Sequence, residues 1–254
     1  MVPRPLGKTG LAVSPIALGT TKLGRNTNVK YKQSFELPSD AEVNELLEHC
    51  LSLGVNLIDT APAYGESERR LGKFIALNRD KLVLCTKCGE QYKPGHSTYD
   101  FSAAAISTSV EESLRRLKTD HVDILLLHSN GDDTEILTKT GAPETLHRLK
   151  ESGKATTIGI SAKTPAGISA ASAIMDVVMA PFSQKDSSLG DALKKARESG
   201  IGVLAIKGLY SGHLDAQAAI EFVLRHFFID ALVLGTINPQ HLRAAVATAE
   251  RVLR

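Results

Sequence analysis

The chain has 254 residues, of which 43% are hydrophobic and 23% are charged, enough apolar material for the core of one large α/β domain. Its 30 basic and 28 acidic residues leave a formal charge of +2, and no long run of one sign predicts a surface for nucleic acid or membrane. No apolar stretch approaches the roughly 20 residues of a membrane-spanning helix.

The first residues, MVPRPLGKTG, lack the apolar core of a signal peptide. The three cysteines are an odd number, which is typical of proteins from a reducing compartment. Cys85 and Cys88 form a C-x-x-C pattern, but they lie in a strand-like run, LVLCTKC, with no second pair to complete a zinc site. We therefore expect a cytoplasmic protein without a metal centre.

Short apolar runs alternate with amphipathic segments along the chain. The apolar runs predict strands at 16–20, 55–60, 82–87, 122–128, 156–161, 177–182, 203–208 and 231–236. The amphipathic segments predict helices at 39–53, 67–78, 103–118, 143–152, 165–174, 189–199, 215–228 and 239–252. Eight strands alternating with eight helices indicate an α/β fold, the (β/α)8 TIM barrel. An open doubly wound sheet is the alternative, but the first strand is not followed by the G-x-G-x-x-G spacing.

Residues 1–14 precede the first predicted barrel strand. The Lys-Thr-Gly stretch at 8–10 lies between short apolar segments, which favours a hairpin turn over the end of a phosphate-binding loop. We expect an N-terminal β-hairpin that closes the bottom of the barrel. No Pro/Gly/Ser-rich linker divides the chain, so residues 1–254 are predicted to form a single domain.

Three successive strands carry polar residues where they end. The second strand ends in Asp59, the third in Lys87 and the fourth in His128, while Tyr64 lies in the loop after Asp59. Barrel enzymes build their sites from the carboxyl ends of strands, and neighbouring strands lie about 4.8 Å apart. Each residue alone has an ordinary structural explanation, but their coincidence on neighbouring strands predicts a catalytic group.

These residue types suggest proton transfer. A tyrosine has an unperturbed pKa of about 10, and a nearby cation is expected to lower it. Lys87 could supply that charge with Asp59 holding the ammonium, while His128 hydrogen-bonds a substrate carbonyl. The predicted result is a general acid placed over a carbonyl oxygen.

Several segments resemble the aldo-keto reductase superfamily. DTAPAYGESERRLG resembles the family signature, and PLGKTGLAVSPIALGT resembles its N-terminal hairpin and first strand. SVEESLRRLKTDHVDILLLH is similar to its third helix and fourth strand, and GISA and VLGTINPQHLR are similar to its cofactor segments. The resemblance implies a catalytic tetrad of Asp59, Tyr64, Lys87 and His128, with hydride from NADPH, or from NADH, reducing an aldehyde or ketone.

A phosphate-binding role for the last two strand ends has support beyond the resemblance. Asn238 and Pro239 predict the cap and first residue of a helix, and phosphates bind helix N-termini near these strands of barrels. The full set of expected cofactor contacts is Thr20, Asp59, Ser161, Ala162, Met179, Lys207, Gly208, Leu209, Ser211, Gly212, Gly235, Thr236, Asn238 and His241.

This chain departs from the family pattern at several cofactor positions. Ala162 stands where the family often has asparagine, and Met179 where it has glutamine. Ile206 replaces a stacking aromatic residue, and Gly235 and His241 replace the lysine and arginine of NADPH-preferring members. We expect these changes to narrow the preference for NADPH over NADH.

Two further functions stay open at this stage. Lys87 could form a Schiff base as in a barrel lyase, although Asp59 would keep its amine protonated. The chain could also be a nucleotide-binding regulatory or redox-sensing barrel, as potassium-channel β subunits of this superfamily are. The expected partner is a small carbonyl compound, with substrate loops at 21–38 and 129–142, no nucleic acid, no membrane, and a monomeric or weakly oligomeric state.

Overall fold

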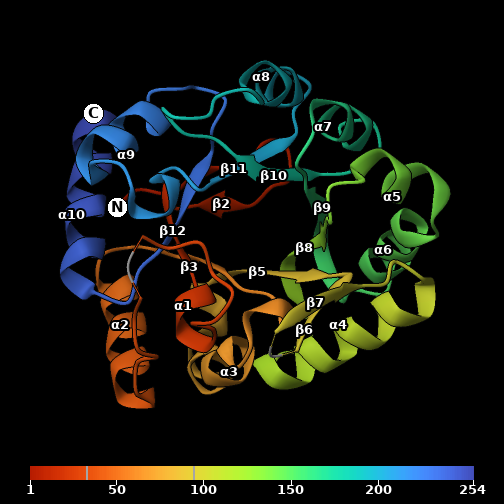
Figure 1. The fold of residues 1–254 in the computed structure, drawn as a ribbon, viewed down its shortest axis with the longest axis horizontal. Helices are drawn as coiled ribbons and strands as arrows, with labels where there is room; N and C mark the ends of the chain where they lie inside the picture. The colour runs from red at the N-terminus through yellow and green to blue at the C-terminus, as the bar shows by residue number, and fades with distance from the viewer. Residues whose placement is uncertain (33, 94) are drawn as a thin grey trace.

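Eight parallel strands close into a barrel in this computed structural model, which describes residues 1–32, 34–93 and 95–254 (Figure 1). The strand order is β10-β11-β12-β3-β4-β5-β8-β9, and pairing of β12 with β3 completes the ring. The barrel strands are β3 (Ile16–Gly19), β4 (Leu57–Asp59), β5 (Val83–Cys88), β8 (Val122–His128), β9 (Ala155–Ser161), β10 (Val177–Pro181), β11 (Gly202–Ile206) and β12 (Ala231–Gly235). The predicted (β/α)8 barrel is confirmed, and the open sheet is excluded because no barrel strand has a free edge.

A ring of helices surrounds the barrel in Figure 1, each following one of its strands. They are α2 (Asp40–Ser52), α3 (Ser67–Asn78), α4 (Ala103–Leu117), α6 (Ala142–Glu151), α7 (Pro165–Ala171), α8 (Gly190–Glu198), α9 (Ala216–Leu224) and α10 (Pro239–Val252). Short polar residues cap five of them by accepting a backbone N–H, which satisfies donors that have no partner inside the helix: Ser39, Ser102, Thr164, Asp215 and Asn238.

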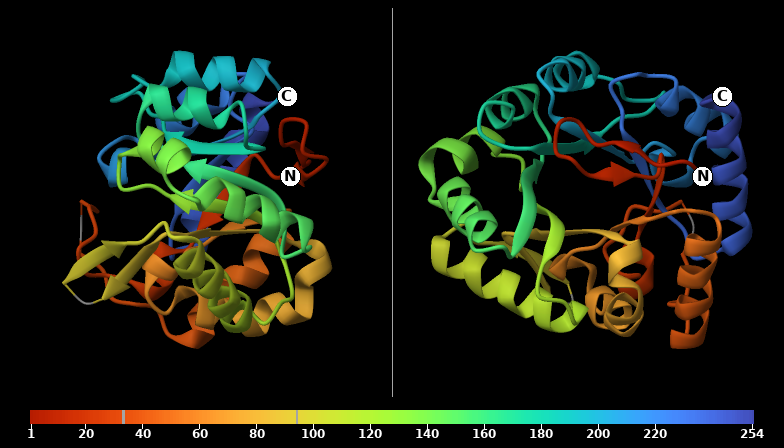
Figure 2. Two further views of the ribbon diagram at one scale, coloured as in Figure 1. Left: turned by 90° about the vertical axis from the view of Figure 1, so that its right-hand side faces the viewer. Right: turned by 180° about the vertical axis from the view of Figure 1, so that it is seen from behind.

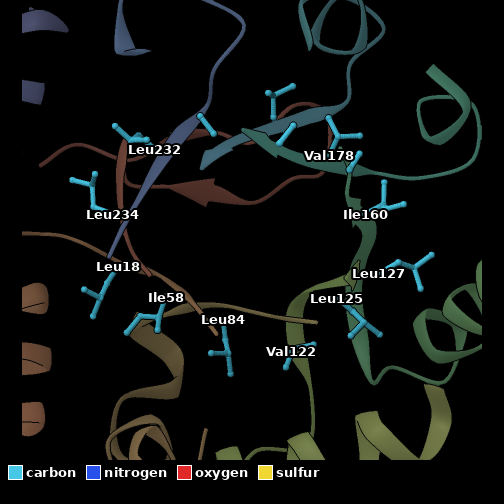
Figure 3. Close-up of a cluster of buried hydrophobic side chains, with 14 of the residues drawn as sticks. Leu18, Ile58, Leu84, Val122, Leu125, Leu127, Ile160, Val178, Leu232 and Leu234 are labelled. Carbon is cyan, nitrogen blue, oxygen red and sulfur yellow. The ribbon is translucent and has the colours of Figure 1, made fainter. Parts of the chain in front are cut away.

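Two apolar layers lie on the two sides of the strands. The outer layer packs under the helices and includes Leu18, Ile58 and Leu84 (Figure 3). The inner layer fills the barrel with alternate residues such as Leu57 and Leu126. Because successive side chains of a strand point to opposite faces, strands buried on both faces are apolar almost throughout, as the sequence showed.

The N-terminal hairpin closes the bottom of the barrel, as predicted. It pairs β1 (Arg4–Pro5) with β2 (Ala12–Val13), and Figure 2 shows it at one end of the molecule. The backbone N–H of Lys8 donates to Gly200 O at 2.8 Å. Gly7 has a φ of +51°, and a Cβ there would lie 2.4 Å from Gly202 N, so no larger residue fits.

A buried aspartate fastens this hairpin to the barrel. Asp230 is 3% exposed and accepts from the backbone N–H groups of Gly7 at 3.1 Å and Val203 at 2.9 Å. Its other oxygen accepts from Nε of Arg197 at 2.8 Å. Arg4 donates to the Asp230 carbonyl at 2.5 Å. Backbone and side-chain donors therefore balance this buried charge.

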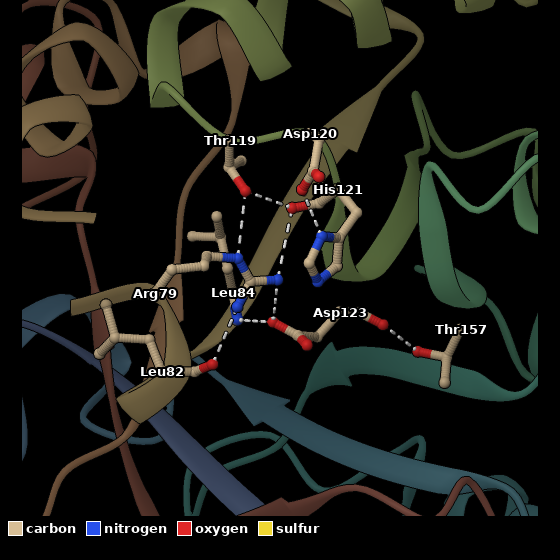
Figure 4. A network of polar contacts seen from close by, with 8 residues as sticks. All are labelled: Arg79, Leu82, Leu84, Thr119, Asp120, His121, Asp123 and Thr157. Atoms are coloured by element: carbon tan, nitrogen blue, oxygen red, sulfur yellow. Dashed lines mark hydrogen bonds and ion pairs between the residues drawn. The ribbon is translucent and has the colours of Figure 1, made fainter. Parts of the chain in front are cut away.

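A second network lies where β5 and β8 begin (Figure 4). Oδ2 of Asp123 is 2.9 Å from the guanidinium of Arg79 and accepts the backbone N–H of Leu84 at 2.7 Å. The same guanidinium donates to Thr119 Oγ1 at 3.2 Å and to His121 O at 3.3 Å. The bottom of the barrel thus holds its buried charges in filled hydrogen-bond networks.

Several elements were not predicted. A hairpin of β6 (Glu90–Lys93) and β7 (His96–Tyr99) follows β5 and projects from the end opposite the N-terminal hairpin (Figure 2). The expected substrate loops contain α1 (Thr21–Gly24) and α5 (Asp133–Lys139). Three single turns of 3₁₀ helix are η1 (Pro62–Tyr64), η2 (Arg79–Lys81) and η3 (Tyr210–Gly212). Across the described ranges, no helix has both the length and the apolarity to cross a bilayer.

Candidate active site

The ends of β4 and β5 bring together two buried charges. Nζ of Lys87 lies 2.5 Å from Oδ1 of Asp59 and donates to Thr60 O at 2.9 Å. The two charged side chains are only 1% and 3% exposed. The structure therefore places this pair together as the strand-end pattern predicted.

Lys87 keeps its positive charge despite burial. Desolvation by burial lowers the pKa of Lys87, but the charges of Asp59 and Tyr64 raise it, and the net direction is upward. A buried amine without such partners would lose its proton. The carboxylate of Asp59 therefore maintains an ammonium ion inside the barrel mouth.

Tyr64 lies above this ammonium. Its turn, η1, ends at Gly65, whose φ is +61° and whose missing Cβ leaves room for Gly24 O. Nζ of Lys87 is 4.7 Å from the centre of the Tyr64 ring. Burial raises the pKa of Tyr64 to about 12, with Lys87 lowering it and Asp59 raising it. The expected lowering of the Tyr64 pKa is wrong, because burial and the Asp59 charge outweigh the Lys87 charge.

His128 completes the group at the end of β8. Its ring centre lies 6.1 Å from that of Tyr64, with the two planes at 87°. Nδ1 of His128 is 2.8 Å from Oε2 of Glu90, the first residue of β6. The contact has the distance of an ion pair but not the angle of a linear hydrogen bond, and Nδ1 is buried without another partner among the described residues.

The pKa values of the two partners reflect this contact. Burial lowers the pKa of His128, Glu90 raises it and Lys87 lowers it, so that the net shift is downward. Burial raises the pKa of Glu90, but hydrogen bonds and charge from His128, together with Ser97 and Tyr99, lower it to about 2. Glu90 is therefore a carboxylate facing an imidazole, and the sequence reasoning missed it.

The hairpin that carries Glu90 also contacts the loop after β3. Oη of Tyr92 is 2.7 Å from Oγ1 of Thr27, and the guanidinium of Arg25 lies 3.6 Å from the centre of the Tyr92 ring. Arg25 also donates to Ala63 O at 3.1 Å, next to Tyr64. These contacts form a polar rim beside the tetrad. The predicted substrate loops contain Arg25 and Thr27 of this rim but not Tyr92.

The expected nicotinamide contacts are at the ends of β9 and β10. Ser161 pairs in register with both His128 and Met179, and Ala162 N donates to Met179 O at 2.8 Å. Met179 is fully buried in the inner layer of the barrel. Thr20 is also fully buried, and its hydroxyl donates to Asp59 O at 2.9 Å. The structure therefore places Thr20 and Met179 beneath the site and not on its surface.

The loop after β11 has an unusual backbone. Positive φ values occur at Lys207 (58°), Tyr210 (47°), Ser211 (58°) and Gly212 (87°). Gly208 packs against β12, since a Cβ there would lie 2.7 Å from Leu232 Cδ1. Left-handed non-glycine residues are uncommon and collect at functional sites.

The charges of two lysines from other loops act on Lys207, which belongs to this backbone segment. Burial lowers the pKa of Lys207, and the positive charges of Lys163 and Lys30 lower it further, whereas Asp186 raises it. Mutual repulsion of this kind is relieved when an anion binds between the charges. The sequence reasoning included Lys207 but missed Lys30 and Lys163, because neither belongs to a motif.

The predicted phosphate segment after β12 begins a helix as expected. Asn238 caps α10 by accepting from Gln240 N at 2.8 Å and His241 N at 3.4 Å. Thr236 Oγ1 accepts from Asn238 N at 3.1 Å, and the His241 residue is exposed. Oη of Tyr31 lies 2.8 Å from the position of a Cβ on Gly235.

The segment that carries Tyr31 reaches across two of these loops. Lys32 N donates to Ser211 O at 3.1 Å, which joins the loop after β3 to the loop after β11. Lys22 lies 4.2 Å from the centre of the Tyr31 ring and 5.0 Å from that of Phe35. These contacts place an aromatic and basic cluster beside the predicted phosphate site.

The structure gives little support for a redox role of the Cys85 and Cys88 thiols or for a metal site among the described residues. Cys85 and Cys88 lie in β5 as predicted, and both are free thiols buried in the protein. Burial, with Asp59 next in effect, raises the pKa of Cys85, and burial raises the pKa of Cys88 to about 12. The residues that the structure describes contain no group of three or more His, Cys, Asp or Glu able to hold a metal ion.

A sequence profile described as the Aldo/keto reductase family matches residues 15–217. The L-galactose dehydrogenase of Arabidopsis thaliana is 33% identical over 239 residues, covering 86% of this chain and 69% of that protein. The 6-dehydroglucose reductase of Agrobacterium fabrum is 32% identical over 281 aligned residues, covering 95% and 90% of the two chains.

Solved structures show the same likeness. A crystal structure assigned to the aldo-keto reductases, from Pseudomonas aeruginosa, has a TM-score of 0.92 at 40% identity and covers 99% of this chain and 95% of its own. The holo form of an aldo-keto reductase from Bacillus halodurans is 24% identical with a TM-score of 0.84, over 98% and 91% of the two chains, and supports the fold.

Proposed function

Because this chain belongs to the aldo/keto reductase family, we propose that it reduces aldehydes and ketones to alcohols with NADPH or NADH, and that Tyr64 is the general acid. The observation that carries the proposal is the buried ion pair of Lys87 and Asp59, 2.5 Å apart, beneath the Tyr64 ring. A buried ion pair is a weak source of stability. Its place at the mouth of a barrel, next to a phenol, is better explained by chemistry.

Each residue of the tetrad has a separate role in this mechanism. The raised pKa of Tyr64, about 12, keeps the phenol protonated at neutral pH and ready to donate. As the proton leaves, the ammonium of Lys87 stabilises the phenolate that remains. Asp59 holds that ammonium in place, and His128, whose ring neighbours that of Tyr64, would face the same substrate oxygen. When bound, the nicotinamide supplies the hydride.

The loops after β11 and β12 would hold the dinucleotide phosphates. Lys207, together with Lys30 and Lys163 whose positive charges act on it, could supply positive charge to a pyrophosphate. Thr236 and the N-terminus of α10 fit an adenosine phosphate, and His241 is an exposed residue on the first turn of that helix. We expect NADPH to bind more tightly than NADH by a modest factor, about fivefold, since Gly235 and His241 stand where NADPH-preferring relatives have lysine and arginine.

The lyase alternative is disfavoured by the state of Lys87. A Schiff base requires a neutral amine, whereas Asp59 and Tyr64 raise the pKa of Lys87 above its usual range despite burial. Its Nζ already makes two hydrogen bonds, to Asp59 and to Thr60 O. Attack on a carbonyl would break both.

The substrate class follows from the rim beside the tetrad. Arg25, Thr27 and Tyr92 present polar groups at the mouth of the site. The named substrates of the two relatives are a sugar and an oxidised sugar. We propose that this chain acts on hydroxylated aldehydes or ketones of similar size, in addition to small activated aldehydes.

A substrate panel tests this proposal directly. Oxidation of NADPH and NADH is measured with small aldehydes, sugar-derived aldehydes and steroid-sized ketones, and the reverse reaction is measured with the matching alcohols. We expect turnover with hydroxylated aldehydes and a higher kcat/KM for them than for bulky apolar ketones. Tight nicotinamide binding without turnover on any compound would instead favour the regulatory barrel.

A further inference from the structure

Glu90, which is not a member of the tetrad, places a carboxylate next to Nδ1 of His128. Its Oε2 lies 2.8 Å from Nδ1 of His128, and the residue is 8% exposed. The base of the β6–β7 hairpin fixes it: Glu90 pairs in register with Tyr99, and Asp100 N donates to Gly89 O at 2.9 Å. The β6–β7 pairing and this hydrogen bond therefore hold the Glu90 carboxylate next to the imidazole.

We propose that Glu90 is a positioning residue that keeps the proton of neutral His128 on Nδ1, so that His128 must gain a second proton on Nε2 before it can donate to a substrate carbonyl. This inference rests on the proposed carbonyl reduction. It assigns a role to a residue outside the four strand-end and loop residues named above.

The chemistry of the two ring nitrogens leads to this conclusion. A carboxylate is only an acceptor, so the proton between Glu90 and His128 belongs to Nδ1. Nδ1 is buried and makes no well-aligned hydrogen bond among the described residues, so the Glu90 carboxylate at 2.8 Å is the acceptor that a proton on Nδ1 faces. In a neutral imidazole, Nε2 then carries a lone pair. A lone pair repels a carbonyl oxygen but accepts a hydroxyl proton.

The same geometry distinguishes the two directions of the reaction. The imidazolium form offers an N–H to a carbonyl oxygen, which suits reduction. The neutral form offers an acceptor to an alcohol O–H, which suits oxidation. Protonation of His128 should therefore favour carbonyl binding and weaken alcohol binding, independently of the proton that Tyr64 transfers.

The groups facing His128 come from four elements. Glu90 faces it from β6, Lys87 from β5, Asp59 from β4 and Tyr64 from η1. Burial lowers the pKa of His128 and the Lys87 charge lowers it too, while Glu90 and Asp59 raise it without reversing the net direction. The imidazolium form of His128 therefore loses its proton at a pH below the usual histidine pKa of about 6.5. Carbonyl binding should weaken as pH rises through that acid range.

The first test is the pH dependence of KM. In the wild type, KM for a carbonyl substrate should rise about tenfold from acid to neutral pH, the effect of one charge-assisted hydrogen bond. Glu90→Leu removes the acceptor, which releases Nδ1 and permits the Nε2–H form at every pH, so the rise should disappear. In Glu90→Gln the rise should shift to lower pH or disappear, because a neutral amide no longer favours imidazolium.

A matched control comes from the same hairpin. Tyr92→Phe loses the 2.7 Å contact with Thr27 but leaves Glu90 in place, so its KM should keep the wild-type pH dependence even if its overall rate changes. Thermal unfolding of each variant shows whether the hairpin remains folded. A wild-type pH dependence in both Glu90 variants would overturn the inference.

A second readout needs no turnover. Nitrogen-15 NMR of histidine-labelled protein, with His128→Asn to assign the signal, reports which ring nitrogen carries the proton. At neutral pH we expect Nδ1–H in the wild type and Nε2–H in Glu90→Leu. An Nε2–H form in the wild type would overturn the inference. Because this measurement is made without substrate, it stands even if no carbonyl compound is reduced.

Discussion

The two ends of the barrel treat buried charge differently. At the bottom, Asp230 receives two backbone N–H groups and an arginine, and Asp123 receives a backbone N–H and another arginine. At the top, Lys87 and Asp59 lie beneath a phenol whose pKa is raised to about 12, near an imidazole whose pKa is lowered. The donors to Asp230 and Asp123 are backbone N–H groups and arginines, which do not titrate near neutral pH, and this suits a structural role. The top brings together groups that can exchange protons.

Backbone conformation shows the same division. Four residues of the loop after β11 have positive φ, three of them not glycine. At the bottom, positive φ in the closing hairpin occurs at Gly7 and Gly10, where the absence of a Cβ removes the strain, and one non-glycine residue at this end, Lys118 after α4, has a φ of +55°. Strain is thus concentrated at the end where ligands are expected to bind.

Among substitutions that test the difference between the two ends of the barrel, the largest effect is expected from a change at Tyr64. Tyr64→Phe should lower kcat by about 10²–10⁴-fold, because the proposed proton donor is lost while the ring remains. Stability should change by less than about 1 kcal/mol, since the hydroxyl lies in a site and not in a filled network. Steady-state rates, cofactor titration and thermal unfolding of one preparation measure all three quantities. Wild-type turnover would refute the assignment of Tyr64.

Asp230→Ala is the corresponding change at the bottom. It should destabilise the protein by about 3–5 kcal/mol, because Arg197 and two backbone N–H groups lose their buried partner. At temperatures where the variant is folded, kcat should stay near the wild-type value. Denaturant unfolding and kinetics check this pair of outcomes. Asp191→Ala, an exposed aspartate on α8, is the matched control and should change neither.

Removing the Asp59–Lys87 ion pair should change stability less than Asp230→Ala does, and it should stabilise the protein instead of destabilising it. The double change Asp59→Leu with Lys87→Met should stabilise the fold by about 1–4 kcal/mol while abolishing turnover, because apolar residues avoid the desolvation of both charges. Lys87→Met alone should destabilise it, since Asp59 would stay buried without its partner. A double variant less stable than either single variant would show that the pair serves mainly as structure.

The strand framework could be predicted because it depends on local pattern. The apolar runs at 122–128 and 231–236 correspond to β8 and β12 within a residue, and the Asn238-Pro239 pair marked the start of α10. Asp59, Lys87 and His128 were found because each ends such a run. Register then follows from barrel closure, so neighbouring strand ends meet without further information.

The remaining parts depend on tertiary contacts. The β6–β7 hairpin is short and polar, so it lacks apolar alternation, and the Pro-Gly dipeptide in its sequence was the one local turn signal. Glu90 therefore had no motif to identify it. The direction of the shift in the Tyr64 pKa could not be predicted from the sequence either, because it depends on whether burial or the Lys87 charge has the larger effect. The effect of Lys30 and Lys163 on Lys207 likewise depends on other loops.

Closure of the barrel between β3 and β12 has a consequence for how the chain folds. Arg4 and Asp230, joined across the bottom, are 226 positions apart, and β12 pairs with β3. A chain emerging from the ribosome therefore carries β3 as an open strand edge until β12 has been synthesised. Contacts between such distant residues form slowly. The growing chain must keep this edge from pairing with its neighbours, and the ring of eight strands closes only after β12 has emerged.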